Sequence, residues 1–125
     1  MLAGHINRIQ TVRLSDHLWG VTQDFQSNLL PELTVLEGFR FDGSSIPLIY
    51  KMVLNNADFG VLEAGCLHDW LYGLGGMVSD DLTLTRKQCD LLYLHELRLY
   101  GISHISSGIA YRAVRMFGGS HFKGA

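Results

Sequence analysis

Cys66-Leu67-His68-Asp69-Trp70-Leu71-Tyr72 is the stretch that decides the fold. Its pattern predicts a helix that presents a histidine, an aspartate and a tyrosine. Successive helical residues are about 100° apart, so His68 and Asp69 face different neighbours. Tyr72 follows His68 by four residues and therefore shares its face. The pattern predicts that His68 moves a proton, while Asp69 holds a cation or a neighbouring loop.

A second helix is expected to run back along the first. The first helix spans about residues 60–72, and the second spans about residues 86–100. The intervening residues 73–81 are rich in glycine and aspartate, which is typical of a loop. Thr85-Arg-Lys-Gln88 fits a capping box at the start of the second helix. These signals predict an antiparallel helical hairpin.

Asp90 is the expected partner of His68 across this hairpin. At about 1.5 Å rise per residue, both residues lie ~6 Å from the connected ends of the two helices. Tyr72 is placed to donate its hydroxyl to Asp90. The pattern leaves two interpretations open. Asp90 either orients a catalytic imidazole, or forms a buried structural hydrogen bond with it.

The arginines near these residues have plainer interpretations. Arg86 and Asp90 are spaced as an i,i+4 surface ion pair worth about 0.3 kcal/mol. Arg112 and Arg115 are expected on a solvated helix face.

The chain divides into a strand-rich part, residues 8–47, and a helical part, residues 48–118. This order predicts an α+β fold, with a small N-terminal antiparallel sheet packed against a C-terminal helical hairpin plus a further helix. The length of 125 residues suits a single domain, 1–125. Besides the hairpin, we expect strands over residues 9–14, 18–25, 33–36 and 39–41, and helices over residues 48–54 and 104–117.

The last of these helices has clear end signals. Ser103 is the expected N-cap, and Gly118-Gly119 is the expected stop. Apolar residues keep helical spacing along it, at Ile105, Ile109, Ala113 and Met116.

Composition narrows the class of protein. The chain is 47% hydrophobic and 18% charged, which indicates a globular protein rather than a disordered one. A net charge of −2 gives no electrostatic basis for binding nucleic acid. No apolar run is long enough for a membrane span, and Met1–His5 is not a signal peptide. Cys66 and Cys89 are expected to be reduced core residues.

The joint between the two halves holds a second polar cluster. Asp42-Gly43-Ser44-Ser45 precedes Pro47 and combines a turn signal with side chains that can bond their own backbone. The cluster predicts a wall of the site formed by Ser44 and Ser45. It is interpreted either as an anion nest or, through Asp42 beside Asp69, as part of a cation site. The alternative is an ordinary strand-to-helix connection.

Five short motifs follow one another along the chain: Gly38-Phe39, Asp42–Pro47, Leu67–Tyr72, Arg86-x-x-x-Asp90 and Tyr111–Gly118. In the order and wording of these motifs, the chain resembles a phage and prophage family known only as domain of unknown function number 1353. The resemblance covers roughly residues 30–118 and implies a bacteriophage or prophage origin without an established activity. Ser44 stands where the family often has Ala.

A weaker resemblance, to small bacterial phospholipases A2, carries chemistry. It rests on His68-Asp69-x-x-Tyr72 followed by Asp90 on the next helix. It implies that His68 activates a water, that Asp69 helps to bind calcium, and that Asp90 and Tyr72 orient His68. The sequence departs from that family at the calcium loop, and Leu71 stands where the family has a cysteine.

Three classes of function follow from these patterns. The first, which we favour, is a phage particle-associated protein of the tail or baseplate type, with a hydrolase-like site of His68, Asp90 and Tyr72 acting on the cell envelope. The second is a purely structural virion protein, and the third is a host-interaction accessory protein. All three place the chain in the virion or the host cytoplasm, with other phage structural proteins as partners. A serine hydrolase using Ser44 or Ser45 is a further alternative that lacks the nucleophile-elbow context.

Overall fold

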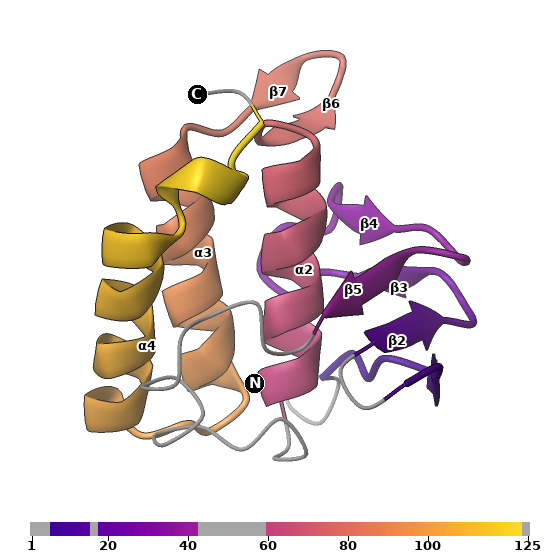
Figure 1. Cartoon of the computed structure of the whole chain (residues 1–125), viewed down its shortest axis with the longest axis horizontal. Coiled ribbons are helices and arrows are strands. Elements are labelled where there is room, and N and C mark those ends of the chain that lie inside the picture. Colours follow the sequence, from indigo (N-terminus) through magenta and orange to yellow (C-terminus); the bar gives the residue numbers. More distant parts are fainter. Residues whose placement is uncertain (1–5, 16–17, 43–59, 124–125) are drawn as a thin grey trace.

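Two layers make up the part of the chain that the computed structural model describes, residues 6–15, 18–42 and 60–123. The strands of the N-terminal half form one layer and the α-helices form the other, with α2 (Val61–Gly73) between those strands and the remaining helices (Figure 1). This arrangement confirms the predicted α+β class. It also places α2, which carries His68, in contact with both layers.

Short strands build the first layer. β1, β2 and β5 form an antiparallel sheet in the order β1-β2-β5, and β3 pairs with β4 in a separate antiparallel ladder. The expected strand over residues 18–25 is therefore two strands, because the chain turns between them and each finds a different partner. The strands are β1 (Thr11–Arg13), β2 (Leu18–Val21), β3 (Phe25–Gln26), β4 (Thr34–Val35) and β5 (Arg40–Asp42).

The helices follow the predicted bounds closely. Thr85 and Gln88 form the predicted capping box, with Gln88 N–H donating to Thr85 Oγ1 at 3.1 Å and Thr85 N–H donating to Gln88 Oε1 at 2.8 Å. Ser103 caps the last helix by accepting from Ser106 N–H. None of the described helices is both long and apolar enough to cross a membrane. They are α2 (Val61–Gly73), α3 (Arg86–Leu99), α4 (His104–Phe117) and the short 3₁₀ helix η1 (Gly119–His121). The helix expected over residues 48–54 lies outside the described residues.

The link between α2 and α3 corrects one prediction. Residues 73–81 were expected to be a loop, but β6 (Met77–Ser79) and β7 (Leu82–Thr83) form an antiparallel hairpin there. Gly76 makes this possible, since its φ of 88° suits glycine and a Cβ there would lie 2.0 Å from Leu84 O. The hairpin closes through Leu84 N–H donating to Gly76 O at 2.8 Å.

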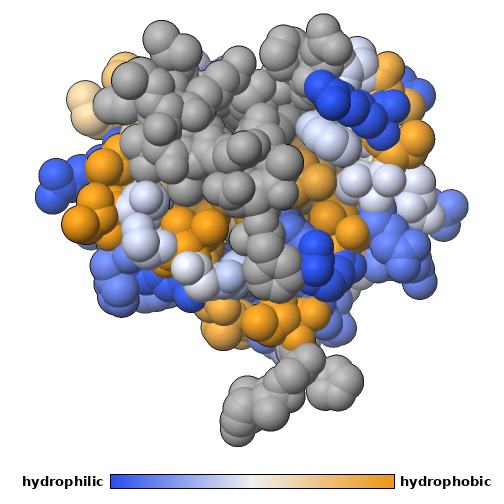
Figure 2. All heavy atoms as spheres, turned by 90° about the horizontal axis from the view of Figure 1, so that it is seen from below, coloured by the Kyte–Doolittle hydropathy of each residue, from blue (hydrophilic) through white to orange (hydrophobic). Residues whose placement is uncertain are grey.

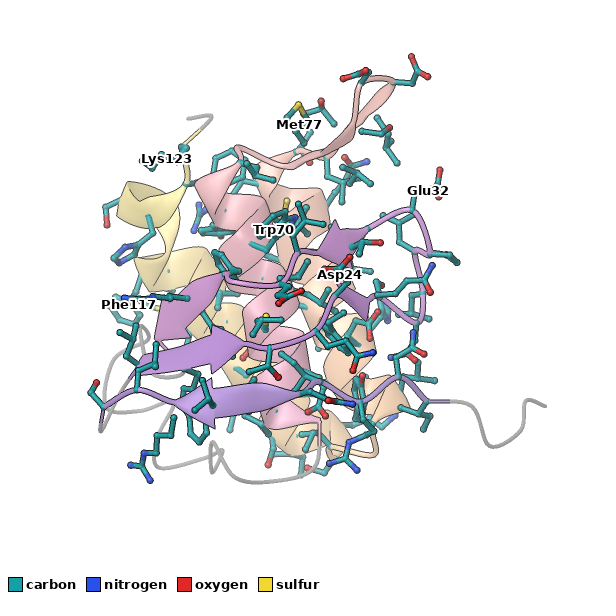
Figure 3. The ribbon with its side chains drawn as sticks, turned by 90° about the vertical axis from the view of Figure 1, so that its right-hand side faces the viewer. Asp24, Glu32, Trp70, Met77, Phe117 and Lys123 are labelled. Atoms are coloured by element: carbon teal, nitrogen blue, oxygen red, sulfur yellow. The ribbon has the colours of Figure 1, made fainter. Side chains whose placement is uncertain are left out.

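The main core lies between the strands and α2. Trp70 lies on the side of α2 toward the strands (Figure 3), and its ring meets Phe39 edge-on, with centroids 5.1 Å apart. This packing fixes the rotation of α2 about its axis, so that His68 faces the other helices. The buried residues of this core are Val21, Phe25, Leu33, Val35, Phe41, Cys66, Leu67, Leu71, Tyr72 and Cys89.

A second core joins the helices to one another and corrects another prediction. Ile105 and Met116 were expected along the apolar face of α4, but they are 77% and 74% exposed. Small residues such as Ala110 face the neighbouring helix instead, which lets the helices approach closely. Other exposed apolar side chains lie in separate groups between hydrophilic ones, as one face of the molecule shows (Figure 2). The buried members of the second core are Val61, Ala64, Tyr93, Leu97, Ala110 and Val114.

Glu96 on α3 is a buried carboxylate that ties the helices to the strand layer. Its side chain accepts hydrogen bonds from Ser27 Oγ at 2.6 Å, Asn28 Nδ2 at 3.1 Å and Leu29 N–H at 3.1 Å. Buried acceptors of this kind are stabilising only while their donors stay in place. Glu96 therefore fixes residues 27–29 against the C-terminal part of α3.

Glu96→Ala is expected to lower the free energy of unfolding by about 3 kcal/mol, because it removes the acceptor of the buried Ser27 hydroxyl and of two partly buried donors in residues 28 and 29. Glu32 is exposed, and Glu32→Ala is expected to change that free energy by less than about 0.5 kcal/mol. Urea denaturation measures both. Equal unfolding midpoints for the two variants would contradict the assigned role of Glu96.

Candidate functional site

His68 and Asp90 meet across the helical hairpin, as their equal depths predicted. His68 Nε2 lies 2.7 Å from Asp90 Oδ1, and the two side chains are 6% and 0% exposed. Tyr72 donates its hydroxyl to the same carboxylate oxygen at 2.6 Å. The geometric part of the prediction is confirmed, whereas the catalytic role assigned to these residues stays a prediction.

Two aromatic rings hold the imidazole of His68. The ring of Tyr72 lies 4.1 Å from it, and the ring of Tyr93 lies 4.8 Å from it, centroid to centroid. Tyr72 comes from the following turn of α2, and Tyr93 comes from the buried face of α3. The imidazole therefore has one well-defined orientation, with Nε2 toward Asp90.

Arg115 completes the surroundings of Asp90 and corrects the prediction of a solvated arginine face. Its Nη1 donates to Asp90 Oδ2 at 2.7 Å, although the Arg115 side chain is 32% exposed. The long aliphatic stem lets the guanidinium reach inward from a position next to the buried Val114. The bond from Arg115 offsets part of the cost of burying the Asp90 carboxylate.

Arg86 also differs from its predicted role, because it does not pair with Asp90. Its Nε donates to the Tyr72 hydroxyl at 3.0 Å, and its Nη2 donates to Val114 O at 2.7 Å and to Arg115 O at 2.9 Å. The first turn of α3 lies beside the last turn of α4 (Figure 1). Carbonyl groups at a helix C-terminus attract a cation, so Arg86 binds that helix end, while the buried Asp90 takes its charged donor from Arg115.

The charges in the site follow from these contacts. Burial alone would raise the pKa of the Asp90 carboxyl, but hydrogen bonds from its described donors outweigh burial and hold that pKa below its ordinary value. Burial lowers the pKa of the His68 imidazole, the Arg86 charge acts in the same direction, and the contact with Asp90 only partly opposes them. Asp90 is therefore ionised and His68 neutral near pH 7.

This charge state selects one tautomer of His68. An ionised carboxylate only accepts hydrogen bonds, so the proton of the neutral imidazole sits on Nε2. Nδ1 is then the unprotonated ring nitrogen, whose lone pair can accept a proton. In chemical terms such an arrangement can act as a general base at Nδ1 of His68, with Asp90 stabilising the protonated form.

The structure describes only some of the other predicted site residues. Asp69 lies on α2, and Asp42 is the last residue of β5, a strand in contact with α2. Ser44 and Ser45 lie outside the described residues. Among the residues that the structure describes, no group of three or more His, Cys, Asp or Glu side chains is arranged to hold a metal ion.

Both cysteines are free and buried, as expected of core residues. Burial, with the nearby charge of Asp90, raises the pKa of Cys89 to about 12. Burial, with the charges of Asp69 and Glu63, raises the pKa of the Cys66 thiol well above its ordinary value. Neither thiol forms the thiolate that a nucleophile requires at neutral pH.

Two buried carboxylates escaped the sequence analysis. Glu96 shares the helical stripe of Cys89 and Tyr93, and an acidic residue at such an apolar spacing is the signal that would have identified it. Glu63 lies on α2 and accepts from Arg8 Nε at 2.9 Å. The inward reach of Arg115 had no comparable signal, because it depends on how α4 crosses α3.

The neutral state of buried His68 predicts a stability loss in mild acid. The unfolded imidazole gains a proton near pH 6.5, whereas the folded one does so only at lower pH. The unfolded state then binds more protons, so stability falls as pH decreases from about 6.5. His68→Gln is expected to flatten the dependence of the urea midpoint on pH between about 7.5 and 5.5. The control is His95→Gln, at an exposed histidine of α3, and it is expected to keep the wild-type slope. Parallel curves for all three proteins would show that His68 is not held neutral.

Arg115→Ala is expected to lower the free energy of unfolding by about 1–2 kcal/mol, because it removes a charged donor from a buried carboxylate and the guanidinium is partly screened by solvent. Arg112 is exposed on the same helix, so Arg112→Ala is the matched control and is expected to change that energy by less than about 0.5 kcal/mol. Thermal and urea denaturation measure both. A larger loss for the Arg112 variant would contradict the assignment.

Comparison with known proteins identifies the family. No curated protein and no solved structure matches the chain. The family described as "Protein of unknown function (DUF1353)" matches residues 19–114, which is more than half of the chain and includes His68, Tyr72 and Asp90. The predicted resemblance to this family is confirmed, and the phage origin that it implies stays a prediction. The chain therefore belongs to the DUF1353 family of proteins of unknown function.

Proposed function

We propose that the chain is a bacteriophage particle-associated protein, of the tail or baseplate type, with a hydrolase-like site that acts on the cell envelope. The observation that carries the proposal is the 2.7 Å contact between His68 Nε2 and the ionised Asp90, which leaves Nδ1 as a base. The phage setting rests on the sequence resemblance. Other phage structural proteins are the proposed partners, and the virion or the host cytoplasm is the proposed location.

The proposed reaction is hydrolysis of an ester or amide bond. Nδ1 of His68 takes a proton from a water molecule whose oxygen bonds to the scissile carbonyl carbon. The imidazolium then gives that proton to the leaving oxygen or nitrogen as its bond to carbon breaks. Asp90 stabilises the imidazolium through Oδ1, and the donors of Tyr72 and Arg115 keep the carboxylate in place. This division of roles matches what the resemblance to small phospholipases A2 implies.

A second candidate function is that of a purely structural virion protein. The observation in its favour is that the His68 side chain is only 6% exposed, while the donors to Asp90 come from both α2 and α4. In that case the cluster only stabilises the fold. A host-interaction accessory protein is the remaining alternative.

An assay of hydrolysis tests the first proposal. The wild type is expected to release product from phospholipid vesicles or from purified peptidoglycan, and His68→Ala is expected to reduce the rate at least about 100-fold through loss of the base. Calcium and a chelator are added in separate arms, which tests the cation expected at Asp69. A thermal melt of the same variant is expected to show a folded protein, because Asp90 keeps Tyr72 and Arg115 as donors.

His95→Ala is the matched control, since His95 is an exposed histidine on α3. It is expected to hydrolyse at the wild-type rate. Wild-type protein that hydrolyses neither substrate, combined with a markedly lower melting temperature for His68→Ala, would favour the structural function. Equal rates for His68→Ala and the wild type would remove His68 as the base.

A further inference from the structure

We propose that Arg86 is a positioning residue for His68. By orienting and polarising the Tyr72 hydroxyl, Arg86 sets the strength of the His68–Asp90 hydrogen bond. The inference deepens the proposed function, on which it rests for the role of His68 as a base. Arg86 does not touch His68 or Asp90 in any described contact. Its Nε–H donates to the Tyr72 hydroxyl at 3.0 Å, and that hydroxyl donates to Asp90 Oδ1 at 2.6 Å.

Two hydrogen bonds, from Arg86 to Tyr72 and from Tyr72 to Asp90, form a relay whose direction follows from the donors and acceptors available. A guanidinium has only donors, and a tyrosine hydroxyl has a single proton. The hydroxyl must therefore accept from Arg86, so its own proton points at Asp90. A hydroxyl that accepts from a cation is polarised and becomes a stronger donor. Arg86 thereby strengthens the bond from Tyr72 to Asp90.

His68 and Tyr72 share one acceptor atom, Asp90 Oδ1. Two donors on the same oxygen compete for its electron density. A stronger bond from Tyr72 therefore weakens the bond from His68 Nε2–H and reduces the basicity of the imidazole. In this way Arg86 adjusts the base from a position outside the His68–Asp90 pair.

The surroundings of Tyr72 hold its side chain in the orientation that bonds both Arg86 and Asp90. The Phe122 ring meets the Tyr72 ring edge-on at 5.1 Å, and Lys123 N–H donates to Tyr72 O at 3.1 Å. A Cβ on Gly118 would lie 3.1 Å from Tyr72 Cε2. Figure 1 shows η1 crossing the helix ends at this point. Tyr72 therefore has little room to turn its hydroxyl away from Arg86.

Arg86 has a second role that a test must separate from the first. Its Nη2 holds the last turn of α4 through the carbonyl groups of Val114 and Arg115. Arg98 makes a similar tie at the opposite end of α4, through Ser107 Oγ at 2.9 Å and His104 O at 3.4 Å. Arg98→Gln is thus a matched control that loosens α4 without touching the relay.

Proton and nitrogen NMR of the full chain, labelled at histidine, tests the proposal through the Nε2–H resonance of His68 at a pH where the imidazole is neutral. Arg86→Gln and Tyr72→Phe are both expected to move this resonance downfield, because the His68–Asp90 bond becomes stronger. Arg98→Gln is expected to lower the melting temperature and to leave the resonance in place. The double variant Arg86→Gln/Tyr72→Phe is expected to coincide with Tyr72→Phe alone. At this pH the imidazole carries no net charge for the Arg86 charge to repel, so Arg86 acts on its hydrogen bond through Tyr72.

Arg86→Lys covers the case in which Arg86→Gln does not fold. An ammonium group can replace the Nη2 contacts to α4, but not the simultaneous Nε contact to Tyr72, so the downfield movement is still expected. An unmoved resonance in the folded Arg86 variants, or a double variant that moves by the sum of the two single ones, overturns the proposal. The measurement needs no substrate. A protein that shows the shifts but hydrolyses nothing therefore refutes the proposed function alone.

Discussion

The buried carboxylate of Asp90 is the constraint on which the helical layer depends. An ionised group with no exposed surface is tolerated only where donors surround it. Here the described donors come from His68 and Tyr72 on α2 and from Arg115 on α4. Asp90 itself sits on α3, so a single carboxylate requires α2, α3 and α4 to converge at one end. Arg86 closes that end by holding the last carbonyl groups of α4.

Helix α3 carries two buried carboxylates with different chemistry. Asp90, near its start, has a charged donor in Arg115, whereas the described donors to Glu96, near its end, are a hydroxyl, an amide and a backbone N–H. The first joins helix to helix, and the second joins helix to the strand layer through residues 27–29. The same helix thus organises both cores. Its position relative to α2 and to the strands is specified by directional hydrogen bonds as well as by apolar packing.

Local sequence signals were enough to predict the hairpin and its central pair. Capping at Thr85 and equal depth from the connected helix ends placed His68 opposite Asp90, because both signals depend only on residues close in sequence. Arg115 was missed, since its reach to Asp90 depends on how α4 crosses α3. The exposed Ile105 shows the same limit. Periodicity finds an apolar stripe, but the small residues of α4 packed inward because they allow closer helix contact.

Stability and basicity make opposing demands on Asp90. Each donor that compensates the buried carboxylate also withdraws electron density from it, and so weakens its support for a protonated His68. The described contacts favour stability, since Tyr72 and Arg115 both donate to Asp90 and Arg86 polarises Tyr72. The result is an imidazole that is neutral near pH 7 but only moderately basic. For the proposed hydrolysis, a base of this kind favours substrates whose carbonyl carbon is already electrophilic, such as esters, over unactivated amides.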